Sequence, residues 1–237
     1  MSGSILELTA VVKNYGGLRP LRIEQFALAA GEQTAIVGLD GPGAEVFINL
    51  VTGATLPEQG TVRAFGRATS EIADADAWLA AADRFGIFSE RAVMLDSLTV
   101  VQNLSMSFSL EIEPPGPDIE RQAHALADDV GLALDDRARR VADVGPLARA
   151  RVRLARALAF NPEILLLEHP SAGIARNELS ALARQVRDLA ASRRFASVTL
   201  TADAEFAADV ASRVLSLEPG TGRLREARRR RWFSLRR

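Results

Sequence analysis

A glycine-rich loop between an apolar segment and a helical segment most constrains the fold of this 237-residue chain. Residues 34–37 predict a short buried strand, and residues 44–51 have the spacing of a helix that ends at Thr52 and Gly53. The backbone N–H groups of such a loop, with the dipole of the following helix, can hold the phosphates of a nucleotide. The same glycines also suit a plain strand-to-helix turn, so the loop alone leaves both interpretations open.

Strand and helix patterns alternate along the rest of the chain. Period-two apolar patterns in the first third predict antiparallel strands, and short apolar runs in the last third predict buried parallel strands separated by helices. The predicted strands are residues 5–12, 21–28, 61–65, 164–167, 196–201 and 214–217. Residues 72–143 are expected to be mostly helical. This alternation predicts an α/β fold that begins with a small antiparallel region.

The composition excludes several kinds of chemistry. Cysteine is absent, which excludes disulfides, thiolate metal sites and a cysteine nucleophile. The two histidines, His124 and His169, are too few for a typical zinc site, and we expect His124 on a helix surface. No apolar run approaches the roughly eighteen residues of a membrane-spanning helix, and the amino terminus lacks the pattern of a signal sequence. We therefore expect a cytoplasmic protein.

The charges are distributed unevenly, and Lys13 is the only lysine. Residues 223–237 hold eight arginines and one glutamate, which leaves an acidic body and a basic tail. Cationic and aromatic residues together suit an anionic membrane surface, and the residues concerned are Arg228, Arg229, Arg230, Arg231 and Trp232. A short solvated tail is the alternative. Nucleic acid ranks third, because no base-reading motif accompanies these charges.

Further motifs extend the pattern of the glycine loop. They are residues 98–100 with Asn103, residues 151–158 and 161–167, Pro170, and the strand 198–201 followed by Asp203. In order and spacing these motifs, over about residues 5–224, resemble the ATP-binding cassette of ABC transporters. The resemblance implies a P-loop NTPase-like (RecA-like) core with an N-terminal antiparallel β subdomain and an inserted helical lobe. It places the core at about 1–85 and 145–222, the lobe at about 86–144, and a basic tail at 223–237.

The resemblance assigns nucleotide contacts to residues that the chain retains. Tyr15 matches the aromatic residue that stacks on adenine in the family, although a tyrosine that ends a β segment is as often a packing residue. Gly38, Gly41 and Gly43 match the phosphate loop.

At two positions of the loop the chain departs from the family. Ala44 replaces the lysine, Glu45 replaces the serine or threonine that binds magnesium, and Lys13 lies too far away to substitute. Losing the lysine contact costs about 1.5–3 kcal/mol, and a glutamate about 4 Å from a phosphate adds repulsion on the order of 4 kcal/mol. We expect no resident cofactor and at best weak ATP and magnesium binding. We also hypothesise that Glu45, in the first helical turn, accepts loop N–H groups as a substitute for phosphate.

The catalytic positions that the resemblance implies are also replaced. Glu90 aligns with the metal-sensing glutamine, Glu168 with the magnesium-binding aspartate, His169 with the catalytic glutamate, Ala202 with the switch histidine, and Ala175 with the aspartate of the dimer-contact loop. The signature motif aligns with Val144, Gly145, Pro146, Leu147 and Ala148. His169 could serve as a base, but the metal and the lysine that stabilise the transferred charge are missing. Glu168 could hold a cation with Glu45, and the alternative is that Glu168 bonds the neighbouring backbone. We therefore expect no intact catalytic residue and no metal site.

These substitutions favour a hydrolysis-incompetent cassette, or pseudo-ATPase. In the family two cassettes pair head to tail, and the helical lobe grips a coupling helix of a membrane permease. The resemblance thus implies a structural or regulatory subunit, docked to a permease or to another ABC subunit at the inner face of the membrane. Two alternatives remain open: an active transporter ATPase with divergent motifs, and a soluble protein-interaction module no longer linked to transport.

Overall fold

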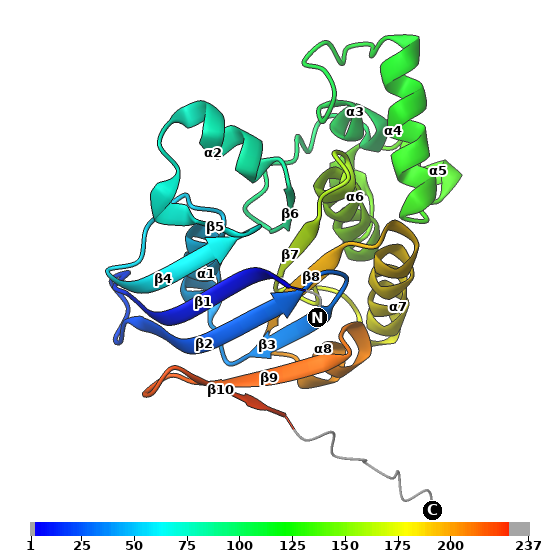
Figure 1. Ribbon diagram of the computed structural model, residues 1–237. Helices are drawn as coiled ribbons and strands as arrows, with labels where there is room; N and C mark the ends of the chain where they lie inside the picture. The colour runs from blue at the N-terminus through cyan, green and yellow to red at the C-terminus, as the bar shows by residue number, and fades with distance from the viewer. Residues whose placement is uncertain (1–2, 228–237) are drawn as a thin grey trace, which may run out of the picture.

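Two β-sheets organise the protein in the computed structural model, which describes residues 3–227 (Figure 1). The first sheet is antiparallel, in the order β2-β1-β4-β5, and consists of β1 (Ser4–Lys13), β2 (Leu21–Ala29), β4 (Gln59–Ala64) and β5 (Arg67–Ala68). The second has the order β10-β9-β3-β8-β7-β6. Its strands are β3 (Gln33–Val37), β6 (Phe85–Phe88), β7 (Ile164–Glu168), β8 (Ala196–Thr201), β9 (Arg213–Glu218) and β10 (Arg223–Glu226). Neighbouring strands run parallel from β9 to β6, and β10 is antiparallel to β9.

Helix α1 (Gly41–Val51) packs between the two sheets. Its residue Phe47 is fully buried and meets Phe26 of β2 edge to face, with the ring centroids 6.0 Å apart. Ile164 and Leu166 of β7 belong to the same apolar cluster as α1. Leu165 of β7 belongs instead to a second cluster on the opposite face of the parallel sheet. Because β7 is covered on both faces, its sequence is a continuous apolar run.

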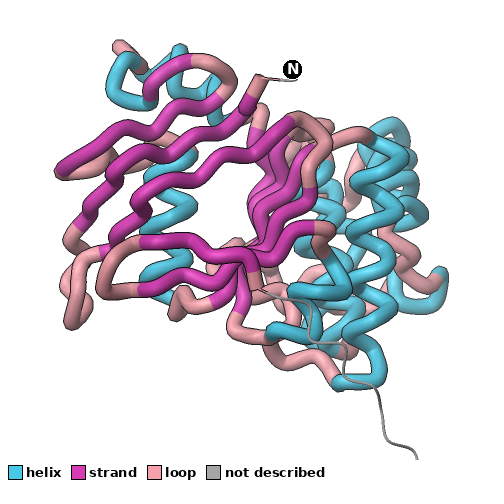
Figure 2. Tube along the Cα trace, turned by 60° about the horizontal axis from the view of Figure 1, so that its bottom comes forward, coloured by secondary structure: helices cyan, strands magenta, loops and turns pink. Residues whose placement is uncertain are grey.

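Helices cover that opposite face of the parallel sheet, as Figure 2 shows. Those that share the apolar cluster on this face are α3 (Val100–Ser105), α4 (Pro117–Asp129), α6 (Pro146–Leu158), α7 (Arg176–Arg193) and α8 (Ala204–Val210), and the short α5 (Leu134–Arg137) packs against α3. The short helix α2 (Ala75–Ala82) connects the antiparallel sheet to β6, with a 3-10 turn at Thr69–Glu71 before it, and a second 3-10 turn at Val141–Asp143 precedes α6. The α/β fold, its antiparallel region and the seven predicted strands are confirmed.

The structure differs from the sequence-based expectations at two places. Residues 85–88, which fall within the stretch 72–143 expected to be mostly helical, form edge strand β6 parallel to β7, so the expected boundary between core and lobe at 85/86 also falls inside a strand. Periodicity cannot distinguish a four-residue apolar strand from a piece of helix. The first residues assigned to the basic tail form β10, which pairs with β9. The residues predicted to meet a membrane, Arg228 to Arg231 and Trp232, lie outside the described residues.

No helix within residues 3–227 is both long and apolar enough to cross a membrane. Within the same range, no three histidine, aspartate or glutamate side chains gather in a way that could hold a metal ion.

Candidate functional site

The glycine loop ends in a helix whose N-cap is Asp40. The carboxylate Oδ1 of Asp40 accepts a hydrogen bond of 2.8 Å from the N–H of Gly43, and a carboxylate is favoured at this positive end of a helix. A Cβ atom at Gly43 would lie 2.8 Å from that oxygen, so a larger residue there would displace the Asp40 carboxylate from its capping position. An acidic side chain of the chain itself therefore occupies the N-terminal end of α1.

This geometry corrects the hypothesis that Glu45 substitutes for phosphate. Helix α1 begins at Gly41, three residues earlier than predicted, so Glu45 lies beyond the first turn. The loop N–H is bound by Asp40 instead. Ala44, at the position of the family's lysine, is fully buried in the cluster between the two sheets.

Glu45 pairs with an arginine that the motif comparison did not single out. Its Oε1 lies 2.5 Å from Nη1 of Arg91, and both side chains are about half exposed. The same guanidinium reaches Glu168 at the end of β7, with Nη2 at 2.9 Å and Nε at 3.2 Å from Oε2. Ser89 donates a hydrogen bond of 2.5 Å to this Oε2. Arg91 thus bridges two carboxylates, one of them nearly buried.

This bridge decides between two earlier interpretations of Glu168. Its side-chain partners are Ser89 and Arg91, so the prediction that it bonds the neighbouring backbone is wrong. The cation that Glu168 shares with Glu45 is a guanidinium of the chain itself. Magnesium prefers oxygen ligands free to surround it, and here a fixed positive charge lies between the two carboxylates. The residues present do not fit the metal ion that the family uses.

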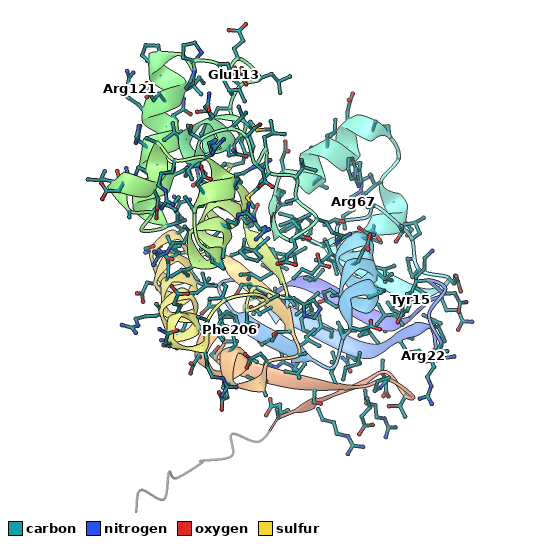
Figure 3. The ribbon with its side chains drawn as sticks, turned by 180° about the vertical axis from the view of Figure 1, so that it is seen from behind. Tyr15, Arg22, Arg67, Glu113, Arg121 and Phe206 are labelled. Carbon is teal, nitrogen blue, oxygen red and sulfur yellow. The ribbon has the colours of Figure 1, made fainter. Side chains whose placement is uncertain are left out.

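Tyr15 lies beside the loop, near α1 in Figure 3. Its hydroxyl would be 3.7 Å from a Cβ atom at Gly43, and its ring would be 2.8 Å from one at Gly17. The ring also packs against the cluster between the sheets. Burial, and then the negative charge of Asp40, raise the pKa of Tyr15. These contacts support a packing role for Tyr15.

The signature position forms the start of α6. Gly145 is its N-cap without a side-chain hydrogen bond, and Pro146 is its first residue. Because proline has no N–H, one donor is missing from this helix terminus. Val144 is buried, whereas Leu147 and Ala148 pack partly buried against the cluster on the helical side.

His169, Glu90 and Pro146 meet at one pocket of about 170 Å³. His169 directly follows β7 and has a φ of 44°, in the left-handed region. Its backbone N–H donates to the carbonyl of Leu200 at 2.8 Å, while its Nε2 is buried without a hydrogen-bond partner. The structure thus brings together three positions far apart in the sequence.

Three further candidate positions are not among the residues that line this pocket. Ala202 is exposed between β8 and α8, and Ala175 is the N-cap of α7 without a side-chain hydrogen bond. His124 on α4 is 41% exposed, with Nε2 3.9 Å from Glu120, as expected for a surface histidine.

Comparison with known proteins identifies the family. A family model described as ABC transporter matches residues 21–172, which is more than half of the chain. The chain belongs to the ABC transporter family. This ABC protein is 29% identical over 195 residues to a ribose import ATP-binding protein of Rhizobium etli, covering 81% of this chain and 37% of the relative. It is 30% identical over 216 residues to an Fe(3+) ions import ATP-binding protein of Rhodococcus jostii, covering 91% and 60%. It thus spans between about two-fifths and three-fifths of these relatives.

Solved ATP-binding cassettes share the fold of this ABC protein. A dimeric cassette in a post-hydrolysis state, bound to ADP and phosphate, is 20% identical with a TM-score of 0.75 over 93% of this chain and 98% of that one. The cbiO1 protein of Clostridium perfringens, part of an ABC transporter complex, is 19% identical with a TM-score of 0.77, over 94% and 87%. The predicted P-loop NTPase-like fold is therefore confirmed.

Sequence reasoning missed the residues that most change the site of this ABC protein. Arg91, Ser89 and Asp40 were not singled out, because the comparison of motifs considered only positions with a known role. Two features of the sequence could have pointed to these residues. Acidic residues at 45 and 168 require a nearby positive charge, and an aspartate two residues before a proline is a helix-start signal.

Proposed function

We propose that this ABC protein is a pseudo-ATPase, a cassette that does not hydrolyse ATP and acts as a structural or regulatory subunit of a transporter complex. The observation that carries the proposal is the guanidinium of Arg91 between Glu45 and Glu168. In the family these two positions bind magnesium, which neutralises the charge of phosphoryl transfer. A bridging arginine offers neither the ligands nor the space for that ion.

The charges around the loop support the same conclusion. Asp40 caps the helix that would receive the phosphates, and Glu45 lies one turn further along. The loop has no lysine to offset these carboxylates, because the only lysine of the chain is Lys13. Repulsion on the order of 4 kcal/mol from the Asp40 carboxylate at about 4 Å, together with about 1.5–3 kcal/mol for the lost lysine contact, weakens a micromolar site to beyond millimolar.

A groove between β6 and α6 supports the docking role. Its volume is about 390 Å³, and residues at the end of α2 and directly after α3 contribute to its lining. Ile87 and Phe160 line it with 40% and 65% of their surface exposed, and Met106 lines it from the segment after α3. Arg153 and Arg156 add positive charge. This combination suits an amphipathic helix with an acidic edge, contributed by a permease at the inner face of the membrane.

Titration calorimetry tests the loss of the nucleotide site. We expect no heat when the native chain meets millimolar Mg-ATP or ATP with EDTA. The triple variant Ala44→Lys, Glu45→Thr, Arg91→Gln restores the lysine and removes the bridge, so it should bind Mg-ATP measurably. Arg91→Gln alone is the matched control, which should stay silent because it lacks the lysine.

The native measurement alone can overturn the proposal, even if the variants fail to fold. Micromolar binding of Mg-ATP by the native chain would contradict it. So would phosphate release by the native chain that the Glu168→Gln variant abolishes, and either result would favour an active ATPase with divergent motifs.

A further inference from the structure

Helix α2 is only loosely attached to the rest of the protein. None of its residues is buried, and no other helix or strand packs extensively against it. Trp78 on its inner face is partly covered, whereas Asp76, Leu79, Ala80 and Asp83 on its outer face are exposed. These four positions have the spacing of one helix face, and we call them the α2 stripe. The α2 stripe is an open surface with an apolar centre and a carboxylate at each end.

The side chains around the α2 stripe carry charge of one sign. Residues 69–83 contain four acidic residues and no lysine or arginine. They are Glu71, Asp74, Asp76 and Asp83, all exposed, and none of them forms an ion pair with another of the described residues 3–227. Such a single-sign surface attracts a cationic partner, and the attraction extends over about a Debye length, roughly 10 Å at 0.1 M salt.

The end of the chain carries the opposite charge. Residues 228–237 contain six arginines and no acidic residue, together with Trp232, Phe233 and Leu235. The forked guanidinium of arginine pairs well with carboxylates, and the three apolar side chains provide a surface for Leu79 to pack on. In both charge and apolar content this segment therefore complements the α2 stripe.

The segment 228–237 cannot reach the α2 stripe of its own chain. It follows β10, and Figure 1 shows β10 and α2 on opposite sides of the molecule. Ten residues span at most about 35 Å when fully extended. A globular chain of this length has a radius of gyration of roughly 18 Å, hence a diameter of roughly 45 Å, and a path around its surface is longer still. The segment that matches the α2 stripe is therefore that of another molecule.

We propose that the α2 stripe is an interaction surface for segment 228–237 of a second copy of this chain. Two copies that exchange these segments reciprocally form a closed dimer with two equal contacts. An anionic membrane would account for the arginines alone, whereas a second copy accounts for the arginines and for the uncovered acidic stripe. The groove between β6 and α6 does not take the segment, because Arg153 and Arg156 line it and repel a cationic chain.

Sedimentation velocity of the full chain tests the proposal. At about 50 mM salt we expect the native chain to self-associate, and at about 500 mM its association should be about tenfold weaker or more, because salt screens exposed charges. The α2 variant, Asp76→Lys with Asp83→Lys, reverses the charge of the stripe. The tail variant, Arg229→Glu with Arg231→Glu, reduces the charge of the segment. Each should weaken association by about tenfold or more.

The matched control reverses two other exposed acids. Glu113 precedes α4 and Asp135 is on α5, and neither forms an ion pair with another residue of the described range. The variant Glu113→Lys with Asp135→Lys changes the net charge as much as the α2 variant does, and it should associate as the native chain does. Mg-ATP should not alter the native association, because neither the α2 stripe nor segment 228–237 belongs to the glycine loop. This contact can therefore hold or fail independently of the proposed loss of ATP binding.

Mixing the two variants gives a readout that misfolding cannot imitate. Neither variant should associate with itself, but the α2 variant keeps an intact basic segment and the tail variant keeps an intact α2 stripe. An equimolar mixture should therefore form a heterodimer through one contact. If either variant fails to fold, a synthetic peptide of residues 228–237 added in excess should still dissociate the native assembly. The same peptide with serine in place of each arginine should not.

Four results would overturn the proposal. They are a native chain that stays monomeric at low salt, an α2 variant that associates like the native chain, a mixture without the heterodimer, and a native assembly that the peptide leaves intact. A monomeric chain that binds vesicles of phosphatidylcholine and phosphatidylglycerol, with no binding by the tail variant, would assign segment 228–237 to an anionic membrane instead.

Discussion

Arg91 shows how one side chain can change the chemistry of a conserved fold. It meets Glu168, whose side chain is 9% exposed, and Glu45 at the same time. Motif comparison predicted that both carboxylates stand at former magnesium positions. It could not identify their partner, because Arg91 has no motif role and its reach depends on how β6 and β7 lie side by side.

Removing Arg91 should therefore destabilise the protein. In Arg91→Met, Ser89 remains as the described side-chain partner of a nearly buried carboxylate, so the free energy of unfolding should fall by about 2–3 kcal/mol. Urea denaturation at neutral pH measures this change. Arg121→Met is the control, since the pair of Arg121 with Asp118 is highly exposed and its loss should cost less than about 0.5 kcal/mol. Equal effects of the two variants would show that the bridge contributes nothing to stability.

At the scale of elements, the apolar patterns predicted most of the strands, but the start of α1 was placed late and the strands β6 and β10 were missed. The strand β7 was predictable because both of its faces are buried and its sequence is a continuous apolar run. The start of α1 was placed late, because Pro42 and three glycines resemble helix breakers although proline suits a first turn. The strand β6 was missed because its role depends on β7, which follows it by some eighty residues.

The contact between β6 and α6 gives a prediction about Gly86. A Cβ atom there would lie 2.2 Å from the carbonyl oxygen of Ala157, so α6 can approach β6 closely only over a glycine. Gly86→Ala should lower the free energy of unfolding by about 1–3 kcal/mol, through overpacking. Thermal denaturation compares it with Gly3→Ala, where a Cβ would meet no atom within 4 Å. An unchanged free energy of unfolding for Gly86→Ala would mean that α6 can shift against β6 without cost.

Glu32 ties the turn between β2 and β3 to β9, and its contribution should depend on pH. Its carboxylate accepts hydrogen bonds from the N–H of Ala29, the hydroxyl of Thr34 and the guanidinium of Arg213. Burial alone would raise the pKa of Glu32, but these bonds outweigh it and hold that pKa below its ordinary value of 4.5. The stabilisation is thus present above pH 4.5 and is lost as the pH falls through the folded-state pKa.

The variant Glu32→Gln measures this contribution. At pH 7 its free energy of unfolding should be lower than that of the native chain by about 1–2 kcal/mol, and the difference should shrink in acid. Denaturation curves between pH 7 and about pH 3 show whether it does. Glu71→Gln is the control, because the Glu71 carboxylate has no described partner, so the native-minus-variant difference should stay near zero throughout. A Glu32→Gln difference that is constant with pH would contradict the assignment.

The whole molecule combines two apolar clusters that meet across the parallel sheet. The resemblance to the family predicted this architecture, since the sheet order and the helical side depend on many matched segments. The docking groove was not predictable in detail, because Ile87, Met106 and Phe160 come from three separate segments that only the fold brings together.

If this groove receives a permease helix, a negative charge at its rim should weaken the binding of that helix. Phe160→Asp should reduce the fraction of the chain recovered with the membranes of the cells that naturally make it, because binding weakens by about tenfold or more when a buried aromatic contact is lost. Leu134→Asp on α5 is the control, since Leu134 is 75% exposed and lies outside the groove. Membrane recovery unaffected by Phe160→Asp, or absent for the native chain, would favour a soluble interaction module.

The arginine bridge also has a consequence for the history of such a chain. Changing Arg91 alone leaves both Glu45 and the nearly buried Glu168 without their shared positive charge, so this substitution is harmful until another accompanies it. A path back to a magnesium site that begins with the loss of Arg91 must therefore cross a less stable intermediate. Epistasis of this kind disfavours reversion, so it helps to retain the altered site once the substitutions have accumulated.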